Sequence, residues 1–137
     1  MKRLRKFILV ILAAVLTLTM AACAAKSAFE FDKDAAVQRA GEIIDIVNTK
    51  DYEEIYNAFG EETRKLTTVD GIKASFEPVY DITGTFIEIK STEALGLIAK
   101  DGKEYINVYV KAAYEKGTFI NTVSFDPDLN LQGFFTK

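Results

Sequence analysis

The sequence predicts an α+β domain in which N-terminal helices pack on a curved antiparallel sheet of four to five strands. Two observations support this prediction. Between residues 34 and 79, apolar residues recur at helical spacing, and after Gly84 they alternate with polar residues, as they do in strands. A run of helices followed by a run of strands is typical of the α+β class, and a chain of 137 residues indicates one domain.

The first two predicted helices are marked by aspartates that can cap them. The first helix begins after Asp34, whose carboxylate can accept hydrogen bonds from first-turn amides, and it ends near residues 48–50. Its apolar face consists of Val37, Ala40, Ile43, Ile44 and Val47. The second helix begins after Asp51, with Glu54 completing a capping box, and we expect Gly60 to end it.

A third helix is predicted to begin after Thr68, whose hydroxyl can cap it. Its apolar face continues through Ile72 and Phe76. Pro78 has no amide hydrogen and disfavours a helical conformation in the residue before it. We therefore expect this helix to be short, or broken near Glu77.

The second half of the domain is predicted to consist of strands joined by short turns. The strands are expected over residues 85–92, 95–99, 105–114, 118–125 and 131–136. Asp101-Gly102, Lys116-Gly117 and residues 126–130 have the composition of turns. In the clearest strand, Ile106, Val108 and Val110 share one face, while Tyr105, Asn107 and Tyr109 share the other.

Residues 1–22 have the composition of an export signal. Four cations, Lys2, Arg3, Arg5 and Lys6, precede an apolar run and then small residues, as in secretory signal peptides. The alternative is a membrane-spanning anchor. The segment from residue 7 to residue 22 is shorter than the about 20 residues that a spanning helix needs, so we expect a cleaved signal.

The end of this segment resembles the lipobox of bacterial lipoproteins. Met20-Ala21-Ala22-Cys23 has an aliphatic residue and two small residues before a cysteine. The resemblance implies a lipid on Cys23 and cleavage just before it. The alternative is ordinary cleavage at the pattern Ala22-Cys23-Ala24. Because Cys23 is the only cysteine, it has no disulfide partner within the chain, and acyl chains on its thiol explain its presence.

These features divide the chain into residues 1–22 as lipoprotein signal, 23–33 as lipidated cysteine and short tether, and 34–137 as the folded domain. Removal of the signal takes away four of 17 basic residues and none of 20 acidic ones, so the mature charge is −7. An acidic surface disfavours nucleic acid as a partner. We expect the chain at the extracytoplasmic face of a cell membrane.

The order of motifs in the mature chain resembles that of a known family. The motifs are Lys50-Asp51-Tyr52, Phe59, Leu66-Thr67, Gly84-Thr85-Phe86, Val123-Ser124-Phe125-Asp126 and Leu131-Gln132-Gly133-Phe134. They resemble those of small bacterial lipoprotein domains of unknown function with the cystatin-like cone fold, also described as nuclear-transport-factor-two-like. The resemblance spans residues 35–135. It implies that fold and brings no catalytic residue with it, because its motifs are packing and turn residues.

The composition limits the chemistry that the chain can perform. The sequence contains no histidine, so triads with a histidine base and metal sites with histidine ligands are impossible. We expect no catalytic residue, no metal site and no cofactor. Asp126, Asp128 and Asn130 have the spacing that opens a calcium loop, but glycine and glutamate are missing later in it, so we predict a hairpin turn. Glu61 and Glu62 are expected in a solvated helical turn.

The tyrosines offer two candidate sites. If the space between helices and sheet encloses a pocket, Tyr80 with Asp81 is expected at its rim; the alternative is that the aromatic residues fill a solid core. The face formed by Tyr105, Asn107 and Tyr109 is a candidate surface for a partner or a second copy.

Three hypotheses about function follow. The first is a non-enzymatic lipoprotein domain that binds an envelope protein or a small ligand. The second is an enzyme that uses a carboxylate, Asp81 or Glu88, with a tyrosine in acid–base chemistry. The third is a structural module that forms a homodimer through the outer sheet face.

Overall fold

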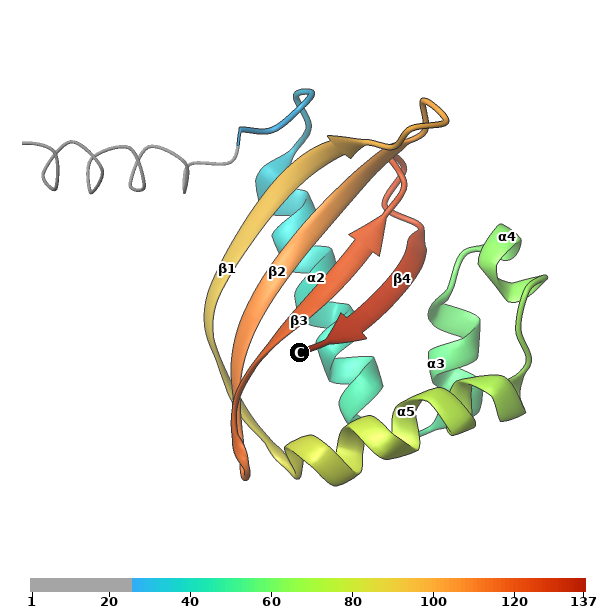
Figure 1. Ribbon diagram of the computed structural model, residues 1–137, viewed down its shortest axis with the longest axis vertical. Coiled ribbons are helices and arrows are strands. Elements are labelled where there is room, and N and C mark those ends of the chain that lie inside the picture. The colour runs from blue at the N-terminus through green and yellow to red at the C-terminus, as the bar shows by residue number, and fades with distance from the viewer. Residues whose placement is uncertain (1–25) are drawn as a thin grey trace, which may run out of the picture.

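The computed structural model describes residues 26–137, in which helices precede strands (Figure 1). Within this range the helices are α2 (Lys33–Asn48), α3 (Tyr52–Ala58), α4 (Glu61–Arg64) and α5 (Val69–Thr83). The strands are β1 (Phe86–Ile98), β2 (Glu104–Tyr114), β3 (Gly117–Phe125) and β4 (Leu131–Thr136). They form one antiparallel sheet in the order β1-β2-β3-β4. This arrangement confirms the predicted α+β class, with a curved sheet of four strands.

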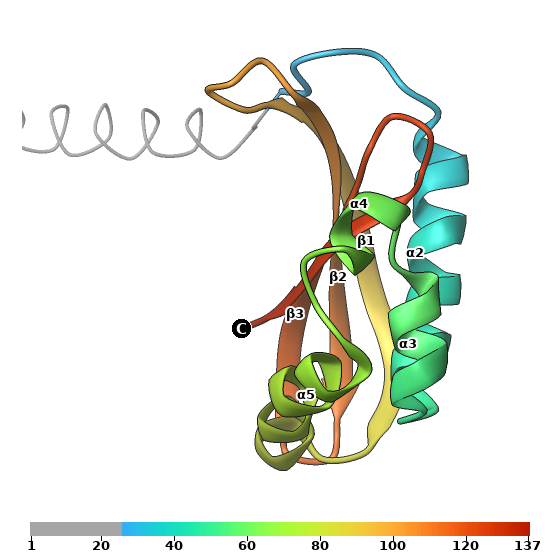
Figure 2. The same cartoon turned by 90° about the vertical axis from the view of Figure 1, so that its right-hand side faces the viewer.

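The core lies between α2 and the side of the sheet that we call the inner face. Helix α2 runs along the sheet, and α5 crosses the end of the molecule that lies away from residue 26 (Figures 1 and 2). The fully buried residues include Ala36, Ala40, Ile43 and Ile44 of α2, Val108 and Val110 of β2, and Val123 and Phe125 of β3. The predicted apolar faces of α2 and β2 are therefore the faces that pack together. We call the opposite side of the sheet the outer face.

Strand β1 corrects the prediction of two separate strands over 85–92 and 95–99. It is continuous over 13 residues and pairs with β2 along its length. Its register shifts twice, between Phe86 and Glu88 and between Ile89 and Ser91. Such bulges bend a strand without ending it. The predicted interruption, at residues 93 and 94, lies where pairing with β2 is regular; there the exposed stretch 87–93 gives way to the buried residues 94–96, so the side-chain pattern changes while the backbone pairing continues.

The helix caps agree with the sequence at two positions and differ at a third. Asp51 accepts hydrogen bonds from the amides of Glu53 and Glu54, both at 3.1 Å, and Thr68 accepts one from Gly71 at 3.1 Å. The predicted cap Asp34 is wrong, because the Asp32 carboxylate accepts from the amide of Ala35 at 3.0 Å and α2 begins earlier. Both Asp32 and Asp34 fit the capping pattern in the sequence. The chain enters the helix directly after Asp32, so Asp32 is the cap.

The predicted role of Gly60 is also wrong. Helix α3 ends at Ala58, and Gly60 follows in an extended conformation as the residue before α4. Its amide donates to the carbonyl of Leu131 in β4 at 2.8 Å. A Cβ at Gly60 would lie 3.0 Å from the Gln132 side-chain nitrogen and 3.3 Å from the Leu131 carbonyl oxygen. Close approach to β4, rather than the end of a helix, favours a glycine here.

Helix α5 continues through Pro78 to Thr83, so the predicted break near Glu77 is wrong. Proline removes the hydrogen bond to the carbonyl four residues earlier, here that of Ala74. Pro78 and Ala74 are both exposed, so water can solvate the unpaired carbonyl. The helix ends at Gly84, which has a φ of 71° and whose amide donates to the carbonyl of Tyr80 at 2.8 Å.

The assignment of Asp32 as the cap of α2 can be tested by substitution. Asp32→Ala removes the side chain that accepts from a first-turn amide, and such losses cost about 1 kcal/mol of unfolding free energy. Asp34→Ala removes an exposed first-turn charge, which stabilises a helix by about 0.3–1 kcal/mol at most at low ionic strength. We expect the Asp32 variant to unfold at a clearly lower urea concentration, in high salt as in low. Equal effects of the two substitutions in high salt would contradict the assignment of Asp32 as the cap.

Candidate functional site

Apolar side chains of the helices and of the inner sheet face pack together in one core. Aromatic residues from separate elements meet there: Phe76 of α5 packs against Phe134 of β4 with ring centroids 5.5 Å apart. Farther along the sheet, the buried Asn121 side chain donates to the Tyr114 hydroxyl at 2.7 Å and accepts from the Thr136 hydroxyl at 2.8 Å. The polar groups in this region satisfy one another. The aromatic residues thus serve as core, which was the alternative to a pocket.

Tyr80 and Asp81 contact different parts of the structure. The Tyr80 hydroxyl donates to the carbonyl of Val47 at 2.6 Å, near the end of α2, and Lys50 lies over its ring at 5.0 Å from the centroid. Burial raises the pKa of Tyr80 above its usual range. Asp81 is exposed, and its carbonyl accepts from the Lys116 ammonium at 2.7 Å. Tyr80 therefore joins α5 to α2, while Asp81 lies on the surface.

Tyr105, Asn107 and Tyr109 do share one surface, the outer face of the sheet. Each is half-buried on the side of β2 that points away from α2. Asn107 accepts a hydrogen bond from the Ser124 hydroxyl of β3 at 2.6 Å. On the neighbouring strand β1, Leu97 is opposite Tyr105, so a leucine and a tyrosine lie side by side.

Two further exposed apolar side chains extend this surface, and the sequence reading did not single them out. Ile120 on β3 is opposite Lys111, and Phe135 on β4 is opposite Thr122, so both lie on the outer face. The Phe135 side chain is 67% exposed. Strand alternation alone would have found Ile120, which is out of phase with the buried Val123 and Phe125. It would have missed Phe135, which is in phase with the buried Leu131 and reaches the outer face through the register shift between β3 and β4. We call Leu97, Tyr105, Tyr109, Ile120 and Phe135 the outer-face patch.

A shallow hollow of about 410 Å³ opens on this face. It is lined by Ser91, Thr92, Glu93, Tyr109, Lys111 and Ile120. Glu93 and Lys111 are exposed, and neither takes part in an ion pair within residues 26–137. The hollow thus offers a tyrosine and an isoleucine between one negative and one positive charge. Such a surface can contact a protein through apolar area and select its orientation by charge.

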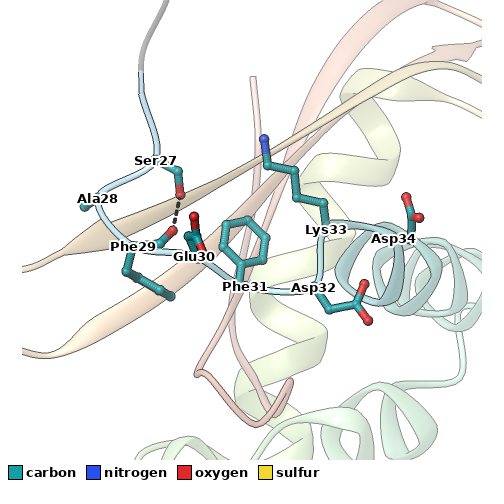
Figure 3. Close-up of a pocket in the computed structure, with 8 residues that line it drawn as sticks. All are labelled: Ser27, Ala28, Phe29, Glu30, Phe31, Asp32, Lys33 and Asp34. Carbon is teal, nitrogen blue, oxygen red and sulfur yellow. Dashed lines mark hydrogen bonds between the residues drawn. The ribbon is translucent and has the colours of Figure 1, made fainter.

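Another hollow, of about 730 Å³, follows the bend of the chain before α2 (Figure 3). It is lined by residues 27–34, a single continuous stretch. The Ser27 hydroxyl donates to the Phe29 carbonyl at 2.7 Å, which fixes the bend itself. Because no other element contributes a lining residue, this hollow lacks the convergent polar groups of a ligand site.

The acidic clusters have structural explanations. Asp126 accepts hydrogen bonds from the amides of Asp128 and Asn130 at 3.0 and 2.9 Å, which confirms the predicted turn. Glu61 and Glu62 are exposed in α4, and both pair with Lys65. The hydrogen bond from Lys65 lowers the pKa of Glu62. Among residues 26–137, no three acidic, cysteine or histidine side chains are grouped to hold a metal ion.

The lipidation site predicted at Cys23 lies outside the described residues, as does the predicted signal peptide. Within residues 26–137, none of the helices combines the length and the apolar character needed to cross a membrane. The lipid on Cys23 therefore stays a prediction from the sequence.

The two buried tyrosines predict an alkaline loss of stability. Burial raises the pKa of Tyr80 and of Tyr114, although the hydrogen bond from Asn121 opposes the shift at Tyr114. The unfolded chain loses these protons near pH 10, while the folded chain keeps them. Unfolding then releases protons, so the free energy of unfolding falls as pH rises above about 10 and is unaffected by these groups below it.

Urea unfolding at several pH values tests the predicted loss of stability at alkaline pH. The double variant Tyr80→Phe, Tyr114→Phe should flatten the alkaline slope, while Tyr80→Phe alone should remove part of it and cost about 1 kcal/mol at neutral pH through the lost hydrogen bond. An unchanged alkaline slope in the double variant would show that other groups cause it.

Comparisons with known proteins agree with this fold. An NMR structure of a protein from Ruminococcus gnavus ATCC 29149 superimposes with a TM-score of 0.65 and 30% sequence identity, over 80% of this chain and 96% of that one. Curated protein sequences gave no match. A family model described as "Protein of unknown function (DUF3887)" matches residues 40–134, which include α3 to β3 entire and most of α2 and β4. The chain therefore belongs to the DUF3887 family of proteins of unknown function.

Proposed function

We propose that this protein is an extracytoplasmic lipoprotein, anchored by a lipid on Cys23, whose domain binds a partner protein through the outer face of its sheet. One observation carries the binding proposal: Leu97, Ile120 and Phe135 are exposed on the same face of the sheet as the half-buried Tyr105 and Tyr109, whereas the apolar residues of the inner face pack in the core. Apolar side chains that gather on one exposed face are typical of interaction sites. The resemblance to small lipoprotein domains with the cystatin-like cone fold supports the anchoring half of the proposal.

The composition of the outer-face patch suits a protein better than a small ligand. Tyrosine, phenylalanine and leucine or isoleucine occur together, and tyrosine and phenylalanine are enriched at the cores of protein interfaces. The hollow beside Tyr109 is open, whereas small-ligand sites bury most of their ligand. Ser124 and Asn107, joined by their hydrogen bond, provide polar groups at the centre of the face.

The enzyme hypothesis depends on the surroundings of its two candidate carboxylates. Asp81 and Glu88 were the candidate carboxylates, and both are exposed. Glu88 pairs with the ammonium of Lys90. The carboxylate–tyrosine hypothesis therefore finds no support from the placement of these residues, and we favour a binding role.

The anchoring half of the proposal is tested at Cys23. In the wild-type chain expressed in a bacterium, we expect the N-terminal peptide to carry a diacylglyceryl group and the protein to fractionate with membranes. Cys23→Ser removes the thiol that is acylated, so the protein should lose its lipid and leave the membrane fraction. An N-terminal peptide that starts at another residue and carries no lipid would contradict the proposal.

Site-specific photo-crosslinking in intact cells tests the binding half. A photo-reactive phenylalanine analogue replaces Tyr109 or Phe135 on the outer face, and in a control chain it replaces Leu66, which is 86% exposed and lies between α4 and α5. We expect both outer-face positions to form the same adduct, and the control to form none. Adducts of equal yield at all three positions would contradict a partner site on this face. An adduct twice the mass of the chain would identify the partner as a second copy.

A further inference from the structure

Hydrogen bonds and packing fix the start of the described chain to one end of β1. The amide of Ala28 donates to the Gly96 carbonyl at 2.8 Å, and the amide of Gly96 donates to the Ser27 hydroxyl at 2.9 Å. The Phe29 ring packs directly on Gly96, where a Cβ would lie 2.9 Å from a ring carbon. Gly96 thus provides the space that lets residues 27–29 lie against the strand, and the position of residue 26 is set by the sheet.

The hairpin between β1 and β2 lies at the same end of the molecule (Figures 1 and 2). We call residues 97–103 the hairpin tip. Its turn is fixed by hydrogen bonds from Ala99 to the Lys103 carbonyl and from Gly102 to the Ala99 carbonyl, at 2.8 and 2.9 Å. Leu97 and Ile98, at the end of β1, are both exposed, whereas residues 94–96 just before them are buried. The apolar exposure at this end has no covering element within residues 26–137.

The charges near the tip differ in balance from those of the whole domain. Three lysines, Lys26, Lys100 and Lys103, are exposed at this end, and none forms an ion pair within the described range. Carboxylates also lie at this end: Glu30, Asp32 and Glu104 line one hollow beside it. Residues 26–137 as a whole carry 13 basic and 20 acidic residues, a net charge of −7. Within the hairpin tip itself, residues 97–103, two lysines stand beside one carboxylate, that of Asp101, so the tip offers positive groups on an acidic protein.

The distance from Cys23 to this end is short. Three residue steps separate Cys23 from Lys26, and a fully extended chain covers at most about 3.6 Å per residue, or about 11 Å in total. A lipid on Cys23 would hold the end that carries the hairpin tip within that distance of the membrane. The opposite end, with α5 and the turn between β2 and β3, would point away from it (Figure 1).

From this geometry we propose that the hairpin tip contacts the phospholipid surface. Ile98 enters the boundary between headgroups and acyl chains, Leu97 marks the membrane-side edge of the outer-face patch, and the ammonium groups of Lys100 and Lys103 bind phosphate oxygens. This contact rests on the proposed anchor at Cys23. It would hold the strands upright on the membrane, so that the outer face of the sheet faces sideways toward other membrane-bound proteins.

Tryptophan fluorescence in vesicles tests the contact, because the chain has no tryptophan of its own. Two matched full-length variants each receive one tryptophan: Ile98→Trp at the tip, where the native side chain is 53% exposed, and Ile82→Trp near the end of α5, where it is 62% exposed. Each lipidated protein is placed in vesicles of phosphatidylcholine and phosphatidylglycerol, with or without brominated acyl chains. We expect a blue shift and loss of most emission at position 98, and neither at position 82.

The outcomes separate this inference from the proposed anchor. If lipid is found on Cys23 and the protein floats with the vesicles, but neither tryptophan is quenched or both are quenched equally, the contact of the tip is overturned and the anchor stands. If Cys23 carries no lipid, both are overturned. Lys100→Glu with Lys103→Glu, in the Ile98→Trp chain, should reduce quenching without changing flotation. Unchanged quenching would overturn the role of the lysines.

Discussion

The packing of α2 on the inner face of the sheet is the contact on which the other features depend. Ala36 and Ala40 are fully buried and small, so the helix backbone can approach β1 and β2 closely. Burial of apolar surface of this kind is the main favourable contribution to folding. Since α2 and its neighbours occupy one face, the outer face has no helix of its own within the described range. The asymmetry of the sheet therefore produces both the filled core and the exposed outer-face patch.

Much of the fold could be predicted because local patterns and tertiary contacts agree. The caps Asp51 and Thr68 and the buried stripe of α2 were readable from spacing alone. Two of the errors occur where a distant contact decides the local structure. Gly60 lies against β4, which begins at Leu131, and β1 stays continuous because β2 pairs with it along its whole length. A short stretch of sequence around Gly60 or within β1 does not include the strand that it contacts.

The candidate site was predicted in part for the same reason. Tyr105, Asn107 and Tyr109 lie on one face because alternate residues of a strand must do so. Tyr80 and Asp81 are consecutive in a helix, where neighbouring residues point in different directions, so they were poor candidates for one pocket. Their separate partners, Val47 and Lys116, come from α2 and the turn before β3, and only the folded chain shows them. The patch residues Ile120 and Phe135 depend on strand register.

The irregularities of β1 also affect how the edges of the sheet can pair with another chain. β1 and β4 are the edges of the sheet, and an unpaired edge can template pairing with another chain. On β1, bulges interrupt the exposed backbone near Ile87 and Lys90, and Ala28 occupies Gly96 farther along. On β4, which is only six residues long, Gly60 occupies Leu131. These bulges and contacts shorten the free edges within residues 26–137, which disfavours edge-to-edge pairing with a neighbouring copy.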